Sequence, residues 1–409
     1  MRAISINKIF VLLFLGACYT LIILNPYLTW GRPGYAAMIV LWLAGLLLNS
    51  KLKINISFWI YWTILILIGA YSSVVAISFG VIQISLFFGL ASMFLLFHAT
   101  IMWSNWLINN NYDPMIPFYG CMFAVMLNTF VILLQILVPG LQAGIEQYFT
   151  PGGNIDFSEG FRLRGMASSG GAALSVLMAL ACVFLLFEGK LKFTNIILRI
   201  GIVLLIFVTM IFVGRTGILL LLIGTSIMSI LSMRLSLALI FTSIAGIILI
   251  NGNSIWDYAD FLIQERFETG VLTYSLGFLS EPEGLQNEGT LQVIIAYLLV
   301  LPDTIFMALF GSGFYGGNEY NFYSDSGLAR VFLAVGYPLG LTLYFIYFRM
   351  LTNNFQHRSK IFIVLLFLLF ISELKEPLLF IGPAARFLAI YAICVSAYNY
   401  RTKYFSRTR

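Results

Sequence analysis

The chain has 409 residues, of which 60% are hydrophobic and only 10% are charged. A soluble domain carries about 25% charged residues, so this composition excludes an ordinary soluble protein and indicates an integral membrane protein. The formal net charge of +6 invites a nucleic-acid-binding function, but the placement of the charges, described below, excludes it. The four cysteines lie singly in apolar runs, which argues against a disulfide framework and against a zinc site.

Apolar runs follow one another almost from end to end, and about 20 apolar residues suffice for one membrane-spanning helix. We therefore expect an all-α polytopic membrane protein, one integral-membrane domain over residues 1–409 with about 12 transmembrane helices. The expected spans are 9–24, 34–48, 57–77, 79–103, 116–138, 168–187, 194–213, 216–232, 235–250, 328–348, 361–374 and 379–398. Leu15-Gly16-Ala17-Cys18 resembles a lipoprotein cleavage site, but the apolar run continues to Leu24, which favours an uncleaved first helix.

Two long polar stretches, 139–167 and 251–327, interrupt the spans and are expected to be loops on the same side of the membrane. Within the second, residues 291–301 are apolar but too few to cross a bilayer, which favours a short interfacial or re-entrant helix. The spans 194–213 and 216–232 meet at residues 214–217, where we expect a tight turn.

Lysine and arginine in short loops indicate the cytoplasmic side of a membrane protein. With the N-terminus inside and twelve spans, fifteen of the 23 basic residues but only two of the 17 acidic residues are cytoplasmic. The net charge is then +13 inside and −7 outside, which predicts that both termini are cytoplasmic.

Eight basic residues remain on the outer side, and seven of them are arginine: Arg32, Arg162, Arg164, Arg215, Arg266, Arg330, Lys375 and Arg386. Arginine binds phosphate through two parallel hydrogen bonds, and an arginine inside a span usually lines a polar cavity. For Arg164, Arg215 and Arg330 this favours an anionic ligand. For Arg32 and Arg266, contact with lipid headgroups or pairing with outer acids is at least as good an interpretation.

Two acidic motifs lie at helix ends. Asp325, in Ser324-Asp325-Ser326-Gly327, directly precedes a span and suits either a helix N-cap or a general base. Glu373-Leu374-Lys375-Glu376-Pro377 ends a span, where a structural ion-pair cluster and a ligand site are equally compatible with the pattern. Because no histidine is expected outside, a carboxylate must act as any side-chain base, with Asp325 first and Glu288, Glu373 and Glu376 as secondary candidates.

Several other chemistries are disfavoured. Gly311-Ser312-Gly313-Phe314-Tyr315-Gly316 fits GxGxxG, but no strand precedes it, so we expect a flexible loop rather than a nucleotide site. His98 lies in a span and His357 in a cytoplasmic loop, which disfavours an outer zinc hydrolase. The sequence also lacks a Gly-x-Ser-x-Gly nucleophile elbow.

These motifs together resemble the bacterial O-antigen polymerase (Wzy-type) family, in the wider group that includes O-antigen ligases. The resemblance is carried by the arginine-rich segment before the central span, the glycine turn and the end of the large loop. The residues are Arg162-Leu163-Arg164-Gly165, Gly214-Arg215-Thr216-Gly217, Gly311-Ser312-Gly313, Ser324-Asp325-Ser326-Gly327, Gly336-Tyr337-Pro338-Leu339-Gly340 and Glu373-Leu374-Lys375-Glu376-Pro377.

The resemblance implies a GT-C-like glycosyltransferase of the inner membrane that polymerises undecaprenyl-diphosphate-linked oligosaccharide units without a cofactor. A Wzz-type chain-length regulator is an implied partner, and no outer Asp-x-Asp motif for a metal is present. Asp325 would be catalytic, and the diphosphate would be bound by Arg162, Arg164, Arg215, Arg330, Lys375 and Arg386. The ligase branch usually has histidine where this chain has Asp325, which favours a polymerase.

Three alternatives stay open. An O-antigen ligase would differ only in its acceptor. A flippase of lipid-linked oligosaccharides, or a secondary transporter, typically shows internal repeats and charges near the bilayer midplane. This sequence has no visible repeat, and its charges gather at one face.

Overall fold

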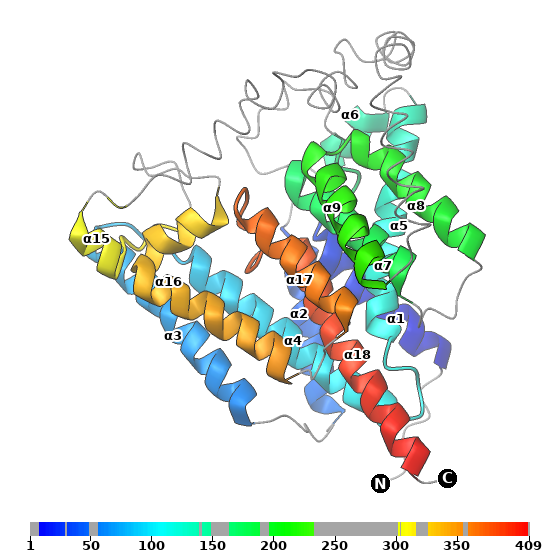
Figure 1. Ribbon diagram of the computed structural model, residues 1–409, viewed down its shortest axis with the longest axis horizontal. Coiled ribbons are helices and arrows are strands. Elements are labelled where there is room, and N and C mark those ends of the chain that lie inside the picture. The colour runs from blue at the N-terminus through cyan, green and yellow to red at the C-terminus, as the bar shows by residue number, and fades with distance from the viewer. Residues whose placement is uncertain are drawn as a thin grey trace.

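The structure is a computed structural model that describes residues 8–28, 31–48, 56–138, 141–148, 163–188, 196–232, 302, 304–315, 326–354 and 359–407. In this part of the chain nearly all regular structure is α-helical (Figure 1). The helices are α1 (Lys8–Leu24), α2 (Pro33–Leu47), α3 (Ile56–Ser78), α4 (Ser85–Asn109), α5 (Ile116–Leu137), α6 (Leu141–Tyr148), α7 (Gly171–Phe187), α8 (Ile196–Ile211), α9 (Arg215–Ser232), α15 (Ile305–Phe310), α16 (Gly327–Asn354), α17 (Lys360–Glu373) and α18 (Pro383–Arg407).

Eleven of the twelve expected spans coincide with helices, and the twelfth, 235–250, lies outside the described residues, as does the expected interfacial segment 291–301. Among the described helices, α3, α4, α5, α9 and α16 are long and apolar enough to cross a membrane, and α1, α2, α7 and α8 are shorter apolar helices. The chain is therefore a helical protein with the character of a membrane protein.

Two expected helix starts are wrong, for local reasons. Helix α4 begins at Ser85 rather than at residue 79, because Gly80 has a φ of +79° and turns the chain. Helix α18 begins at Pro383 rather than at residue 379, because the amide groups of Leu378 and Leu379 bind a side chain instead of starting a helix.

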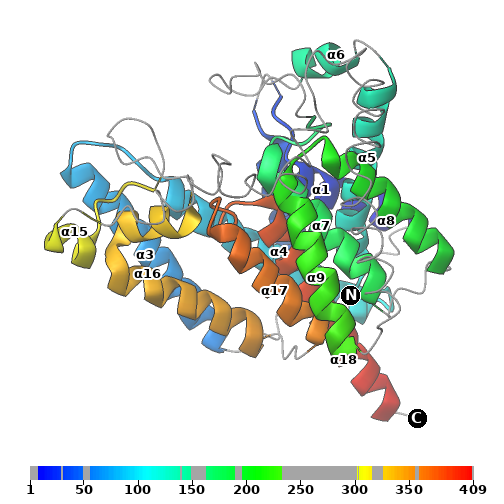
Figure 2. The same ribbon diagram turned by 45° about the horizontal axis from the view of Figure 1, so that its top comes forward.

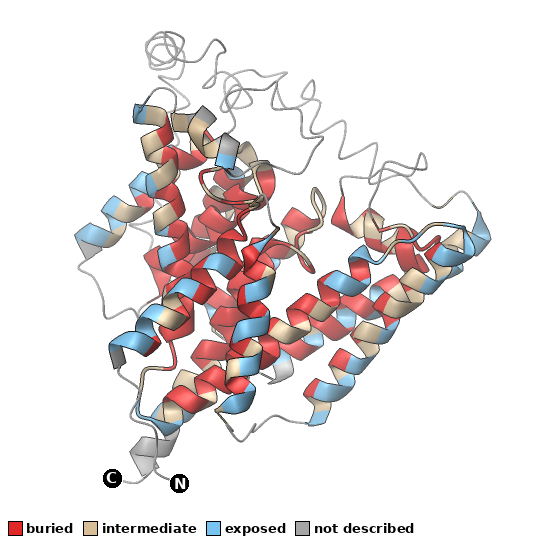
Figure 3. Ribbon diagram, turned by 180° about the vertical axis from the view of Figure 1, so that it is seen from behind, coloured by how far each residue is buried: buried red, intermediate tan, exposed pale blue. Residues whose placement is uncertain are grey.

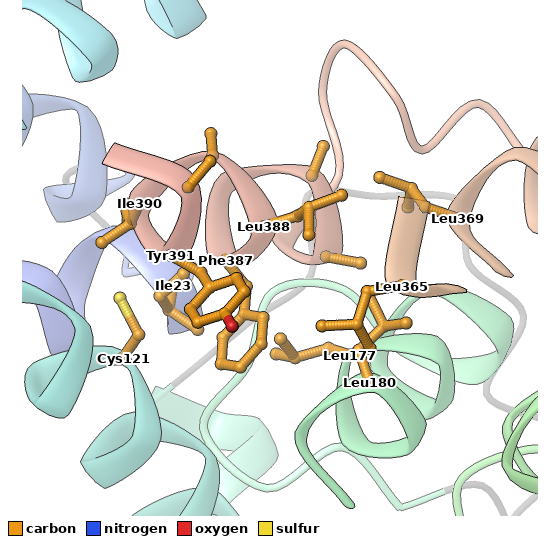
Figure 4. Close-up of a cluster of buried hydrophobic side chains, with 14 of the residues drawn as sticks. Ile23, Cys121, Leu177, Leu180, Leu365, Leu369, Phe387, Leu388, Ile390 and Tyr391 are labelled. Carbon is orange, nitrogen blue, oxygen red and sulfur yellow. The ribbon is translucent and has the colours of Figure 1, made fainter. Parts of the chain in front are cut away.

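Helix α7 forms the centre of the bundle. Every residue from Ala172 to Phe187 is buried, as expected for a helix that is apolar on all sides and surrounded by other helices. Helices α5, α8, α9, α17 and α18 all contact it, so that it lies in the red interior of Figure 3. Figure 4 shows Leu177 and Leu180 of α7 packed with leucines of α17 and with Phe387 and Tyr391 of α18.

Small residues bring α7 and α9 close together at one end. The backbone amide of Gly217 donates to the hydroxyl of Ser175 at 3.1 Å, and a β-carbon on Gly217 would collide with the carbonyl oxygen of Ser175. Close helix packing through small residues is a common means of association within membranes. The turn between α8 and α9 lies at residues 212–214 rather than at the expected 214–217, because Arg215 already begins α9.

Helix α16 is interrupted, and the backbone amides of residues 312–313, which precede it in the chain, supply hydrogen-bond donors at the interruption. Gly336 has non-helical backbone angles (φ 77°, ψ 168°), and Pro338 lacks the N–H that would bind the carbonyl of Ala334. The amide of Gly313 donates to that carbonyl instead, at 2.9 Å, and the amide of Ser312 donates to Leu333 at 2.7 Å. The expected flexible loop is therefore wrong for residues 311–313, which are buried and hydrogen-bonded.

The same segment is held from its other side by α3. The hydroxyl of Ser72 donates to the carbonyl of Gly313 at 3.2 Å, and that of Tyr71 donates to Phe310 at 2.8 Å. Helices α3, α15 and α16 consequently lie side by side on one flank of the molecule, away from α8 (Figures 1 and 2).

Hydrogen bonds between helix ends define two ends of the bundle. At the first, here called the Arg401 end, Arg401 donates to the carbonyl of Tyr112, Arg199 donates to the carbonyl of Glu188, and Lys360 donates to the carbonyl of Leu231. These contacts join the last part of α18 to the connection between α4 and α5, the end of α7 to the start of α8, and the end of α9 to the start of α17. They gather basic residues that the sequence assigns to the cytoplasm.

The opposite end, here called the Arg215 end, is where α17 finishes and α9, α16 and α18 begin. The amide of Ser168, just before α7, donates to the carbonyl of Leu24 at the end of α1 (3.1 Å). The amide of Leu163 donates to Phe212, just after α8 (2.9 Å). Helices α7, α8 and α9 therefore alternate in direction, and so do α16, α17 and α18, as the sequence predicts.

Candidate functional site

Glu373, the last residue of α17, is a buried anchor at the Arg215 end. Its Oε2 accepts hydrogen bonds from the backbone amides of Leu378 (2.6 Å) and Leu379 (2.8 Å). Its Oε1 accepts one from the hydroxyl of Tyr344 at 3.3 Å. Because the side chain is 0% exposed and both of its carboxylate oxygens accept hydrogen bonds, Glu373 suits the positioning of other groups better than contact with a substrate.

The start of α16 lies against this carboxylate. A β-carbon on Gly327 would collide with Oε1 of Glu373, so the first turn of α16 approaches the acid as closely as a backbone can. A helix N-terminus carries partial positive charge and is stabilised by an anion there. Arg330, one turn further and half-buried, also attracts the Glu373 carboxylate. The anchor thereby holds the helix turn that carries Arg330.

Lys375 links the turn after α17 to the start of α9. Its Nζ donates to the hydroxyl of Thr216 at 3.2 Å, and Thr216 directly follows Arg215, the first residue of α9. Lys375, Arg215 and Thr216 are all half-buried. Two cations from distant parts of the sequence are thus neighbours at the same helix start.

Arg164 lies in a segment that two polar side chains of α5 hold in place. Asn128 donates to the carbonyl of Arg164 (3.1 Å) and accepts from the amide of Met166 (2.7 Å), while Gln135 accepts from the amide of Gly165 (3.1 Å). Gly165 permits the turn through its φ of +62°. The side chain of Arg164 then runs past Gly170, immediately before α7, where a β-carbon would lie 2.5 Å from its Nε.

Arg386 is a buried cation in the first turn of α18, only 2% exposed. Its Nη1 donates to the carbonyl of Ile22 at 2.9 Å, and its guanidinium lies 5.5 Å from the centroid of the Tyr35 ring. Arg32, by contrast, is exposed and lies over the ring of Tyr27 at 5.2 Å. This exposed position suits the headgroup contact considered for Arg32.

The predicted cations within the described residues therefore meet at one end of the bundle. Four segments form this end: 163–170, 212–217, 326–330 and 373–386. They contain five cations, which are Arg164, Arg215, Arg330, Lys375 and Arg386. They also contain two acids, Glu373 and the half-buried Glu376. Cations held at helix ends in an apolar bundle can bind an anion strongly, because water screens them less than at an open surface.

Other predicted site residues lie outside the described part of the chain: Arg162, Arg266, Glu288 and Asp325. Within the described part, no three His, Cys, Asp or Glu side chains are grouped so that they could hold a metal ion.

Sequence reasoning missed the polar residues that position the arginines. Asn128 and Gln135 were detectable, because two amides seven residues apart share one face of the otherwise apolar helix α5. Tyr344 gave no such signal, since its hydrogen bond to Glu373 depends on how α16 packs against α17.

Comparison with known proteins gave no match: neither a protein-family description, nor a curated protein, nor a solved structure is significantly similar to this chain.

Proposed function

We propose that this protein is a membrane glycosyltransferase that polymerises undecaprenyl-diphosphate-linked repeat units of O antigen or a related surface polysaccharide. In this proposal the chain is GT-C-like and crosses the bacterial inner membrane twelve times with both termini in the cytoplasm. The Arg215 end then faces the periplasm. The observation that carries the proposal is the set of five cations, opposed by two acids, at one end of an apolar helical bundle. The resemblance of the surrounding motifs to O-antigen polymerases supports it.

The cations suit the leaving group of such a reaction. A hydroxyl oxygen at the non-reducing end of one lipid-linked unit attacks the anomeric carbon of the growing glycan on another. The bond from that carbon to the diphosphate oxygen breaks, undecaprenyl diphosphate departs, and the hydroxyl proton passes to a base. Fixed cations stabilise the negative charge that develops on the diphosphate. We assign this task to Arg164, Arg215, Arg330, Lys375 and Arg386, together with Arg162.

The proposed base is Asp325, which directly precedes the Ser326–Arg330 turn at the start of α16. A positioned base contributes about 10²–10⁴-fold to a reaction of this kind. Replacement Asp325→Asn separates this role from helix capping, because asparagine caps helices well but cannot accept the proton. We expect normal expression with almost no polymerisation; an active Asn variant would transfer the search for the base to Glu288 or Glu376.

Gel analysis of surface polysaccharide from a deletion strain tests the function. A strain that lacks the polymerase should keep lipid A–core capped with a single repeat unit and lose all longer chains. Loss of even the single capped unit would contradict the proposal and indicate a ligase or a flippase. A chain-length regulator of the Wzz type, as proposed partner, should alter only the length distribution when it is deleted.

A further inference from the structure

Tyr315 is held rigidly between three elements of the fold. Its backbone amide donates to Oε1 of Gln83, in the connection between α3 and α4, at 2.7 Å. Two residues earlier, Gly313 bridges α3 and the break of α16, through its bonds with Ser72 and Ala334. Gly313 can do so because its φ is +80° and because a β-carbon would collide with the amide nitrogen of Ala76. The position of Tyr315 is therefore set before any ligand binds.

The side chain of Tyr315 carries a polar group that the described residues do not satisfy. The ring is 2% exposed, and the buried hydroxyl has no hydrogen-bond partner among them. A buried polar group without a partner is rare in folded proteins and costs stability, so each case needs a physical reason. Phenylalanine would fill the same space without this cost.

The surroundings of the hydroxyl indicate what it could bind. It lies within electrostatic range of Arg330 and Glu373, and Glu373 is already engaged by Tyr344 and two backbone amides. Burial, and secondarily Glu373, raise the pKa of Tyr315 well above its ordinary value, so the phenol keeps its proton and can donate it in a hydrogen bond. A donor within electrostatic range of a half-buried arginine suits a phosphate oxygen.

We propose that the Tyr315 hydroxyl binds a phosphate oxygen of the lipid-linked diphosphate alongside Arg330. This assignment rests on the proposed function and adds a neutral donor to a site otherwise built of cations. It also accounts for the unsatisfied hydroxyl, because function commonly retains groups that cost stability in the unliganded protein.

Replacement Tyr315→Phe tests the assignment, with thermal midpoints of the purified full-length protein measured alone, with undecaprenyl diphosphate and with inorganic diphosphate. Without ligand, the midpoint should be equal to or higher than that of the wild type, because an unsatisfied buried hydroxyl is removed. The upward shift caused by undecaprenyl diphosphate should become smaller. In a polymerisation assay, KM for the lipid-linked unit should rise about ten- to a hundredfold, the scale of one hydrogen bond to a charged group. A shift with inorganic diphosphate as well would show that the headgroup alone is recognised.

Two other tyrosines serve as controls. Tyr344→Phe removes a hydrogen bond to Glu373 and should lower the midpoint without ligand. Tyr391→Phe removes a 2.6 Å hydrogen bond to Glu188 at the Arg401 end and should leave the ligand-induced shift unchanged.

The outcomes separate this inference from the proposed function. If Tyr315→Phe lowers the midpoint as Tyr344→Phe does and keeps the wild-type ligand shift, the hydroxyl is structural and the assignment is wrong. If wild-type protein shows neither a ligand shift nor polymerisation, the proposed function fails and the assignment fails with it.

Discussion

The Nζ atom of Lys375 lies 3.2 Å from the hydroxyl oxygen of Thr216, although 159 positions separate the two residues. This hydrogen bond joins the turn after α17 to the first turn of α9, beside Arg215. A lysine that could have extended into solvent is directed instead toward the start of another helix. The contact thus draws together two motifs that the sequence alone treats as separate.

The first prediction concerns this contact. Lys375→Ala should reduce polymerisation about 10²-fold by removing a cation from the diphosphate site. Thr216→Val should reduce it less, about two- to tenfold, because it removes only a hydrogen bond that orients the lysine. Since both changes act through Lys375, the double variant should be no worse than Lys375→Ala alone, as measured by initial rates. Additive losses would mean that Thr216 acts independently of Lys375.

The second prediction concerns the arginines. Arg164→Lys, Arg215→Lys and Arg330→Lys should each impair polymerisation nearly as much as the alanine variants, because lysine keeps the charge but not the planar two-pronged donor. Arg32→Ala, at the exposed arginine over Tyr27, is the control and should retain near-normal activity. If all three alanine variants polymerised normally at wild-type expression levels, the diphosphate site would lie elsewhere.

A third prediction concerns the stability of the Glu373 anchor. Glu373→Ala leaves two backbone amides and the Tyr344 hydroxyl without their acceptor and should destabilise the protein by about 3–5 kcal/mol. Glu373→Gln keeps the shape and one oxygen acceptor, so its cost should be nearer 1–3 kcal/mol. Thermal midpoints in detergent would show this order, and the half-buried Glu376→Gln should have a smaller effect than either. An unchanged midpoint for Glu373→Ala would show that the anchor is not needed.

Topology supplies a fourth prediction. Reporters fused after residue 190 or 355 should report the cytoplasm, and reporters fused near 155 or 285 the periplasm, because of the asymmetry of basic residues. The hydroxyl of Tyr391 is hydrogen-bonded to both Glu188 and Ser359, so the helix ends next to the fusion points at 190 and 355 lie together. A periplasmic signal at 355 would overturn the orientation and with it the proposed location of the site.

The helices were largely predictable from the sequence, because an apolar run long enough to span a bilayer has few other stable structures. The failures arose at helix ends. The start of α18 depends on a side chain, Glu373, that captures the amides of Leu378 and Leu379, and no hydropathy pattern contains that information.

The candidate site was predictable in part. Charge placement in an apolar chain singled out Arg164, Arg215, Arg330, Lys375 and Arg386, because a cation within an apolar bundle is costly and is usually kept for a purpose. The structure brings these five residues to one end of the bundle. Gly336 and Pro338 indicate in the sequence that helix α16 is interrupted. The hydrogen bond from Gly313 to Ala334 was not predictable, because the sequence does not show which segment binds the free carbonyl groups at the interruption. The candidate role of Tyr315 depends on this pairing, because the pairing holds the segment that carries Tyr315 in place.

The most direct measurement is elongation by the purified protein in liposomes that contain undecaprenyl-diphosphate-linked repeat units, with the products resolved by mass spectrometry. We predict a ladder of glycans, each longer by one repeat unit and still lipid-linked, with one undecaprenyl diphosphate released for each bond formed. Arg215→Ala protein should give no ladder while remaining folded. Lipid-linked units that stay monomeric with folded wild-type protein, or that merely move across the bilayer, would contradict a polymerase.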